Sequence, residues 1–267
     1  MSYPNRLVDL MSFFYRSSGY LSEVVESIRL LLHPIADKLL TEFDHRRLRP
    51  LTPVFAAAYA AKGCPLPHVW ALLDGTFRWF CRPAMDGYRG PAQQAQYSGH
   101  VKGHGNNHQG AQTADGIIIE MNGPNQGRTN DQRMLVASKL LERCMMYCVI
   151  AGVLYYLFGD RGYTHGHPAL QVPYKGRPAV TPNQQRYNGA MSKIRQPVEW
   201  GFGKVSKLWA FVDFEKNQKL YLQPVALYWL IATLLTNCHS CFYGNQTSMY
   251  YGVPTPDVEA LLDSAFL

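Results

Sequence analysis

The hydrophobic pattern of this chain changes near residue 65, and this change limits the folds that the chain can adopt. Before it, apolar side chains in the segment 20–43 recur at helical spacing, and Ser22 is placed to cap a helix. The segment RPLTP at 49–53 is expected to break the helical run, and an alanine-rich helix is expected over 54–62. We therefore predict that residues 1–65 form a helical N-terminal segment.

After Pro67 the pattern becomes that of strands, followed later by helices. VWALLDGTFRWF is apolar and rich in aromatic and β-branched residues, which predicts a buried strand. The further expected elements are two short strands joined by a turn at Ala114-Asp115-Gly116, a helix from Asn130-Asp131, a buried strand within 149–158, and helices over 184–207 and 221–238, with loops over 82–96 and 164–182. This order predicts an α/β fold with a mixed sheet and helices on its faces.

Composition and charge narrow the class of protein. The chain has 267 residues, of which 47% are hydrophobic and 17% charged, so it is expected to be globular and to bury a sizeable core. Its formal net charge is +7 and its pI is about 9.1, a balance that favours a polyanionic partner such as nucleic acid.

Cysteines and apolar stretches indicate an intracellular protein. Cys144/Cys148 and Cys238/Cys241 lie within or beside apolar runs, which favours buried thiols over zinc ligands. The N-terminus lacks the features of a secretory leader. The stretches 145–158 and 224–235 are shorter than a bilayer span requires, so no membrane association is expected.

Three carboxylates stand out by their positions. Asp74 lies in the middle of an apolar strand, where an unpaired charge is costly. Asp160 ends a later strand, and Glu199 lies on a helix one turn after Arg195, close enough to pair with it. Carboxylate oxygens suit Mg²⁺ or Mn²⁺, and two such ions can activate water and stabilise the leaving oxygen of a phosphodiester. A structural interpretation stays open, in which Asp160 is a strand-end residue and Glu199 only a salt-bridge partner.

Four stretches agree, in order, with the motifs of a known family. They are LLDGTFRWFCRP, QYSGHVKGHGNNHQGAQTADGIIIEMNGPNQGRTND, FGDRGYTHGHP and MSKIRQPVEWGFG. From about Pro67 to Asn237 the chain resembles the Harbinger-type DDE transposases, which are endonucleases of the DDE superfamily. The resemblance implies a ribonuclease H-like mixed sheet flanked by helices, preceded by the N-terminal helical segment.

The resemblance also assigns the acids. It implies that Asp74 (DGT), Asp160 (GD-x-GY) and Glu199 (R-x-x-x-E-x-x-F-G) are catalytic residues that bind two Mg²⁺ or Mn²⁺ ions. Asp131, in a G-x-x-x-D motif, is a possible fourth acid. Because Asp131 opens a predicted helix, we interpret it as an N-terminal cap or as a group that supports the metal ligands.

Basic residues near these motifs are candidates for contacts with DNA phosphates. They are Arg161, Arg195, Lys204, Lys207 and Lys102. Arg161 could instead form a salt bridge with a nearby acid, and Lys204 and Lys207 could instead lie on a solvent-exposed face. His100, His104 and His108 recur every four residues, which leaves a zinc site as a minor alternative. His165 and His167 could assist proton transfer or simply lie in a solvated loop.

The chain departs from the family pattern at its N-terminus. The family carries a complete helix-turn-helix, of which only RSSGYLSEVVESIRLLL, from Arg16, resembles the last part. We therefore divide the chain into a truncated helix-turn-helix-like segment over 1–65 and a DDE endonuclease domain over 66–267.

Two functions follow from this reading. The first is a metal-dependent, transposase-derived DNA endonuclease, nuclear, acting on double-stranded DNA as a homo-oligomer, with a separate DNA-binding protein as a further possible partner. The second is a catalytically silent, domesticated relic that binds DNA or protein.

Overall fold

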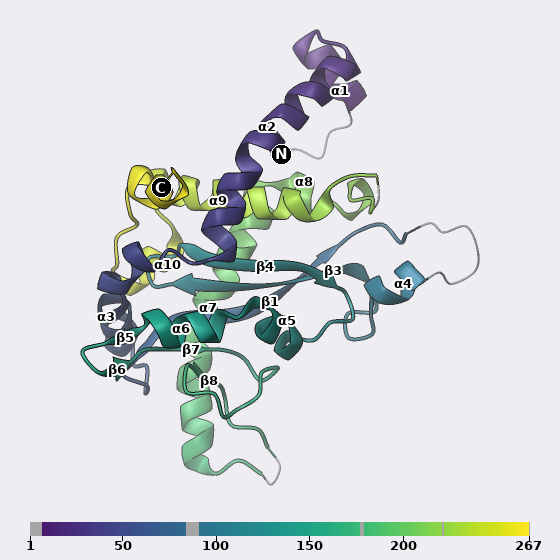
Figure 1. The fold of residues 1–267 in the computed structure, drawn as a ribbon. Helices are drawn as coiled ribbons and strands as arrows, with labels where there is room; N and C mark the ends of the chain where they lie inside the picture. Colours follow the sequence, from purple (N-terminus) through teal and green to yellow (C-terminus); the bar gives the residue numbers. More distant parts are fainter. Residues whose placement is uncertain (1–6, 84–90, 177–178, 221, 267) are drawn as a thin grey trace.

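The computed structural model describes residues 7–83, 91–176, 179–220 and 222–266 (Figure 1). Three helices come first: α1 (Leu7–Phe14), α2 (Ser18–Thr41) and α3 (His45–Ala61). The predicted helical N-terminal segment is therefore confirmed for its described residues. α1 and the N-terminal half of α2 project from the body of the molecule, and no residue of α1 is buried (Figure 1).

The helix boundaries in this segment differ from those expected. Ser17, not Ser22, caps α2 by accepting a hydrogen bond from the Tyr20 amide. The break between helices falls before Asp44, whose carboxylate accepts the amides of residues 46 and 47. The segment 49–53 continues α3 instead of breaking it, because buried side chains such as Phe55 hold the helix against the sheet.

The sheet is built around β1 (Val69–Trp79), which matches the strand predicted there. Its strand order is β2-β3-β1-β7-β8, and β4 pairs with β3. β3 is antiparallel to β1 and to β4, whereas β7 is parallel to β1 and to β8. The other strand bounds are β2 (Tyr97–Ser98), β3 (Gly103–Thr113), β4 (Ile118–Gln126), β7 (Tyr156–Phe158) and β8 (Leu170–Gln171), with a separate hairpin of β5 (Val149–Ile150) and β6 (Val153–Leu154).

The remaining helices cover the sheet. They are α4 (Pro91–Gln96), α5 (Asp131–Ser138), α6 (Leu140–Tyr147), α7 (Pro182–Leu208), α8 (Ala210–Asp213), α9 (Val225–Tyr243), α10 (Gln246–Tyr251) and α11 (Val258–Phe266), with a 3₁₀ turn at Glu215–Asn217. The predicted loop over 82–96 thus contains α4, and its residues 84–90 lie outside the described part of the chain. Figure 1 shows α2 and α9 on one side of the sheet and α5 and α6 on the other.

Helix α9 serves as a core helix. In the described residues it is the one helix long and apolar enough to cross a membrane by length and composition, at 19 residues, so the stretch expected to be too short is longer than predicted. Ten of its residues are buried, among them Trp229, Leu230 and Leu234. It contacts α2, α7 and β4 in the interior, where an apolar helix is stabilised by packing.

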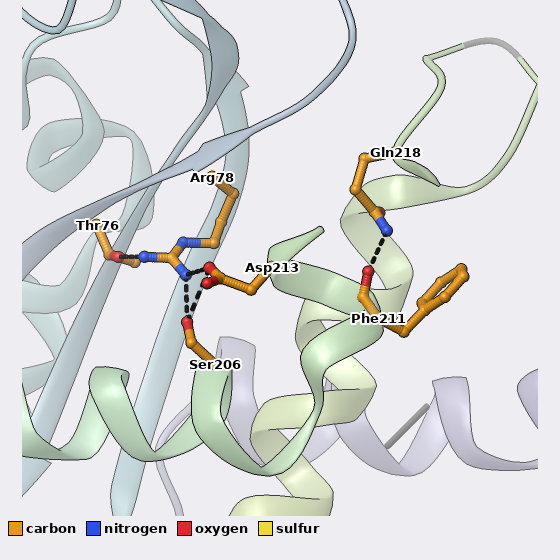
Figure 2. Close-up of polar contacts among 6 residues, drawn as sticks. All are labelled: Thr76, Arg78, Ser206, Phe211, Asp213 and Gln218. Carbon is orange, nitrogen blue, oxygen red and sulfur yellow. Dashed lines mark hydrogen bonds and ion pairs between the residues drawn. The ribbon is translucent and has the colours of Figure 1, made fainter. Parts of the chain in front are cut away.

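An arginine on β1 links the central strand to the helices that follow α7. Figure 2 shows the Arg78 guanidinium donating to Thr76 Oγ1 at 2.8 Å, to Ser206 Oγ at 2.7 Å and to Asp213 Oδ1 at 3.2 Å. The guanidinium also lies 4.2 Å from the ring centroid of Trp229 on α9. These contacts fix one end of α7 against β1. The mixed sheet, flanked by helices and preceded by a helical segment, is the predicted fold and is consistent with a ribonuclease H-like fold.

Candidate active site

Asp74 points from β1 toward helix α7. It pairs with Gly110 across the β1–β3 ladder, and residues directly opposite each other share a face of the sheet. The ring of Phe202 covers that face at Gly110, where an added Cβ would lie 2.7 Å from Phe202 Cζ. Asp74 is therefore held between the sheet and α7, with its side chain 14% exposed.

Arg195 joins Asp74 to Glu199. Its Nη1 lies 2.6 Å from Asp74 Oδ2, and its Nη2 donates to Glu199 Oε1 at 3.1 Å. Arg195 and Glu199 are one turn apart on α7, a long helix that begins with a complete capping box of Thr181 and Gln184. The predicted pairing of Arg195 with Glu199 is thus present, and the guanidinium contacts Asp74 as well.

Asp160 lies beside Asp74 at the end of the neighbouring strand. The parallel β1–β7 ladder ends with the pair Leu72–Phe158, two residues before each aspartate, and the charge of Asp160 acts on Asp74. The chain turns immediately afterwards, because the Gly162 amide donates to Asp160 Oδ1 at 2.7 Å. Asp74 in the middle of β1 and Asp160 just after the end of β7 therefore lie close together.

The charges of these acids affect one another. Burial, which is the largest cause, raises the pKa of Asp74 to about 6 together with the charges of Asp160 and Glu199, against the opposing effects of Arg195 and the Gly75 amide. A carboxyl group whose pKa lies this high holds its negative charge at a cost. Additional positive charge beside it would therefore be bound favourably.

Asp131 occupies the opposite face of the sheet and is not a helix cap. Asn130 caps α5 by accepting the Arg133 amide at 2.9 Å, so the predicted capping role of Asp131 is wrong by one position. The Asp131 carboxylate lies against two glycines instead: an added Cβ would be 2.8 Å from Oδ1 at Gly75 and 2.5 Å from Oδ2 at Gly162. Only glycine leaves room for the carboxylate at these two places.

The surroundings of Asp131 connect it to Asp160. Burial raises its pKa, the Asp160 charge raises it further, and His100 lowers it. Asp160 thus lies near both Asp74 and Asp131, which face opposite sides of β1. The two glycines on either side of Asp160 and Arg161 have internal neighbours, since Gly162 makes room for Asp131 and Gly159 for the ring of Tyr163.

Sequence reasoning missed Tyr163 and Gln109 as parts of this site. Tyr163 is fully buried, and its pKa is raised by burial and by the charges of Asp131, Asp74 and Asp160. Gln109 donates to the Tyr163 hydroxyl at 2.8 Å and to the Asp131 carbonyl at 3.1 Å. The tyrosine in GDRGY was the available signal, since a buried Tyr next to polar residues needs a hydrogen-bond partner.

The proposed metal ligands are of the kind that binds a hard cation, although their carboxylates do not meet around one point in this structure. Every candidate ligand is a carboxylate oxygen, as Mg²⁺ and Mn²⁺ prefer. Among the described residues, no group of three or more His, Cys, Asp or Glu side chains is close enough to hold one metal ion. In this structure Arg195 lies between the carboxylates of Asp74 and Glu199, and the assignment of Asp74, Asp160 and Glu199 as metal ligands stays a prediction.

Three of the predicted DNA-contacting residues are exposed, whereas Arg195 and Lys204 have partners within the protein. Arg161, Lys102 and Lys207 are exposed. The Lys204 ammonium donates instead to Ser240 Oγ at 3.0 Å and to the carbonyl of Gly244 at 2.9 Å, at the C-terminal end of α9. Its predicted phosphate contact would have to compete with these bonds.

A groove of about 400 Å³ adjoins Glu199 on the side of α7 that faces α9 and α10. Glu199 lies at this groove, together with Trp200, Lys207 and Gln112. Arg195 and Asp74 are not part of its lining. Glu199 is thus the one predicted acid in contact with both the groove and the Arg195 ion pair.

The histidines have separate environments. His108 is fully buried beside Trp229, whereas His100 is exposed in the turn before β3. His165 Nε2 lies 3.0 Å from the Pro173 carbonyl, and His167 Nδ1 accepts the Ala169 amide. These contacts hold the loop that follows Asp160. Proton transfer by either histidine stays a prediction.

The fold is consistent with a ribonuclease H-like protein, with carboxylates in the middle of β1, just after the parallel strand β7, and on the neighbouring helix α7. Residues 73–237 match the family model described as DDE superfamily endonuclease. Since this match spans well over half of the chain, the protein belongs to the DDE superfamily endonucleases. Comparison with curated proteins and with solved structures gave no match.

Proposed function

We propose that the chain is a metal-dependent DNA endonuclease of the Harbinger transposase type, in which Asp74, Asp160 and Glu199 are the catalytic metal ligands. The observation that supports the proposal is the proximity of the acids: the charge of Asp160 raises the pKa of Asp74, and Arg195 contacts both Asp74 and Glu199. All three acids lie within the region that matches the family.

The proposed chemistry is hydrolysis of a phosphodiester bond in double-stranded DNA. Two Mg²⁺ or Mn²⁺ ions, when bound, would activate the attacking water and stabilise the leaving oxygen. The carboxylates of Asp74 on β1 and Asp160 after β7 would share one ion, and Glu199 would bind from α7. Asp131, on the opposite face, would support Asp160 from behind and is not assigned as a ligand.

Partners and location complete the proposal. The net charge of +7 and the exposed side chains of Arg161, Lys102 and Lys207 support contacts with DNA phosphates that do not depend on sequence. We place the protein in the nucleus as a homo-oligomer on DNA, with a separate DNA-binding protein as a further partner. Its affinity for duplexes of any sequence should then fall steeply as salt increases.

The test is nicking of supercoiled plasmid DNA by the full chain. We expect nicks in Mn²⁺ and none in EDTA, and the Asp74→Asn variant should produce no more nicks than EDTA. Nicking that survives Asp74→Asn would mean that the activity comes from another site or from a contaminating nuclease.

The alternative is a catalytically silent protein that binds DNA or protein on the same fold. The ion pair of Arg195 with two of the three acids favours it, because that pair neutralises charge that a metal would otherwise compensate. Salt-sensitive binding of duplex DNA without any Mn²⁺-dependent nicking would support this function over the first.

A further inference from the structure

Arg195 lies between the carboxylates of Asp74 and Glu199. In the proposed function, a divalent ion occupies this position. We propose that the Arg195 guanidinium is a resident counter-ion, which Mg²⁺ or Mn²⁺ must displace before Asp74 and Glu199 can bind the metal together. This inference rests on the proposed function, because it concerns the same carboxylates.

The geometry sets the guanidinium and a metal ion in competition. Arg195 contacts one oxygen of each carboxylate, at 2.6 Å from Asp74 and 3.1 Å from Glu199, through two different nitrogens. A bound Mg²⁺ would need its oxygens at about 2.1 Å from a single point. A planar guanidinium between the two carboxylates keeps them farther apart than that, which accounts for the lack of a three-ligand group among the described residues.

The contacts of Arg195 are of a kind that a divalent ion can replace. Nη1 is buried and close to Asp74 Oδ2, yet it has no aligned hydrogen bond with any described residue. The Glu199 side chain is 58% exposed, so water weakens its pairing with Nη2. Arg78, on β1 beside the C-terminal end of α7, instead makes aligned hydrogen bonds to three oxygens.

The first experiment measures Mn²⁺ binding to the full chain by electron paramagnetic resonance of free Mn²⁺. Arg195→Gln removes the charge, and we expect it to bind Mn²⁺ about fivefold more tightly than the unsubstituted chain, as fits the loss of a partly exposed ion pair. Arg195→Lys keeps the charge and should stay near the unsubstituted value. The matched control is Arg186→Gln on the same helix, where Arg186 is exposed and bonds Asn183, and its Mn²⁺ affinity should not change.

Thermal unfolding separates displacement from a merely structural role. In EDTA, Arg195→Gln should unfold at a lower temperature than the unsubstituted chain, because Asp74 loses its counter-charge. Saturating Mn²⁺ should narrow or reverse this difference, since the variant binds the ion more tightly. An equal deficit in EDTA and in Mn²⁺ would contradict the proposal.

A second measurement uses the unsubstituted chain and does not depend on the variant folding. Phenylglyoxal modifies accessible arginines, and peptide mass spectrometry reports the rate at each one. We expect Arg195 to react faster in saturating Mn²⁺ than in EDTA, while Arg186 reacts equally in both. An Arg195 rate that stays the same or falls in Mn²⁺ would overturn the proposal.

The outcomes distinguish this inference from the proposed function. If the unsubstituted chain binds Mn²⁺ and nicks DNA but Arg195→Gln binds Mn²⁺ more weakly, Arg195 supports the ligands and the inference fails while the function stands. If neither chain binds Mn²⁺, the metal-dependent function fails and the inference fails with it.

Discussion

The contact between β1 and α7 has two ends, and each end holds one arginine. At one end Arg78 is paired with Thr76, Ser206 and Asp213, and it lies over the ring of Trp229. The single carboxylate there is matched by a single guanidinium, and the ring and the hydroxyl groups complete the set.

The other end carries more negative charge than its arginine can balance. Arg195 contacts both Asp74 and Glu199, and Asp160 lies close enough to raise the pKa of Asp74. Burying carboxylates together is unfavourable without a compensating cation. The comparison teaches that the balanced end stabilises the fold, whereas the acid-rich end keeps an electrostatic cost that cation binding would remove.

The largest expected effect is on nicking activity, and it should distinguish the carboxylates of the acid-rich end from the carboxylate of the balanced end. Asp160→Asn at the acid-rich end should lower Mn²⁺-dependent plasmid nicking at least about 100-fold, because it removes a proposed metal ligand. Its matched control, Asp213→Asn at the balanced end, should retain most of the nicking activity. Comparable losses in both variants would mean that the two ends do not differ in function.

Removing the arginine of the balanced end should chiefly affect stability. Arg78→Met leaves Ser206 and Asp213 without their donor, and we expect the free energy of unfolding in urea to fall by about 2 kcal/mol. Nicking per folded molecule should change little, because Arg78 contacts none of the proposed ligands. A variant that unfolds like the unsubstituted chain but no longer nicks DNA would reverse the roles assigned to the two ends.

His108 gives the balanced end a pH dependence. Burial and the Arg78 charge lower its pKa from 6.5 to about 3, and neither ring nitrogen has a hydrogen-bond partner among the described residues. Below pH 6.5 His108 binds a proton in the unfolded chain, whereas in the folded chain it stays neutral until the pH approaches 3. The free energy of unfolding is therefore highest above pH 6.5 and decreases as the pH falls toward 3. From pH 7 to pH 5 the expected contribution to this loss is about 2 kcal/mol.

The measurement for His108 is urea unfolding at both pH values. His108→Leu should remove this part of the pH dependence, whereas His165→Leu, in an exposed loop, should keep it. An unchanged slope in His108→Leu would show that other groups cause the acid sensitivity.

The smallest expected effect concerns the third region near the acids, at the start of α5. Asn130→Ala removes the side chain that accepts the Arg133 amide, and it should lower the free energy of unfolding by about 1 kcal/mol without loss of nicking. Asp131→Asn should relieve repulsion with Asp160 and leave stability nearly unchanged, while activity falls in part. A stability loss for Asp131→Asn as large as that of Asn130→Ala would restore Asp131 as a cap.

The sequence by itself determined the elements whose signals are local. The apolar run around Asp74 predicted β1, and the spacing of Arg195 and Glu199 on a continuous helix predicted their pairing. The family followed from motifs that lie in the expected order along the chain. These features depend on neighbours within a few positions, which a sequence displays directly.

Only the tertiary structure decided which distant groups each side chain contacts. Asp131 lies one position after the cap and packs against Gly75 and Gly162, and Lys204 donates to α9 instead of remaining free. The reach of Arg195 to Asp74 joins residues on a strand and a helix far apart in the chain. Local pattern cannot show this, because partners that compete for one charged group meet only when β1, α5, α7 and α9 pack together.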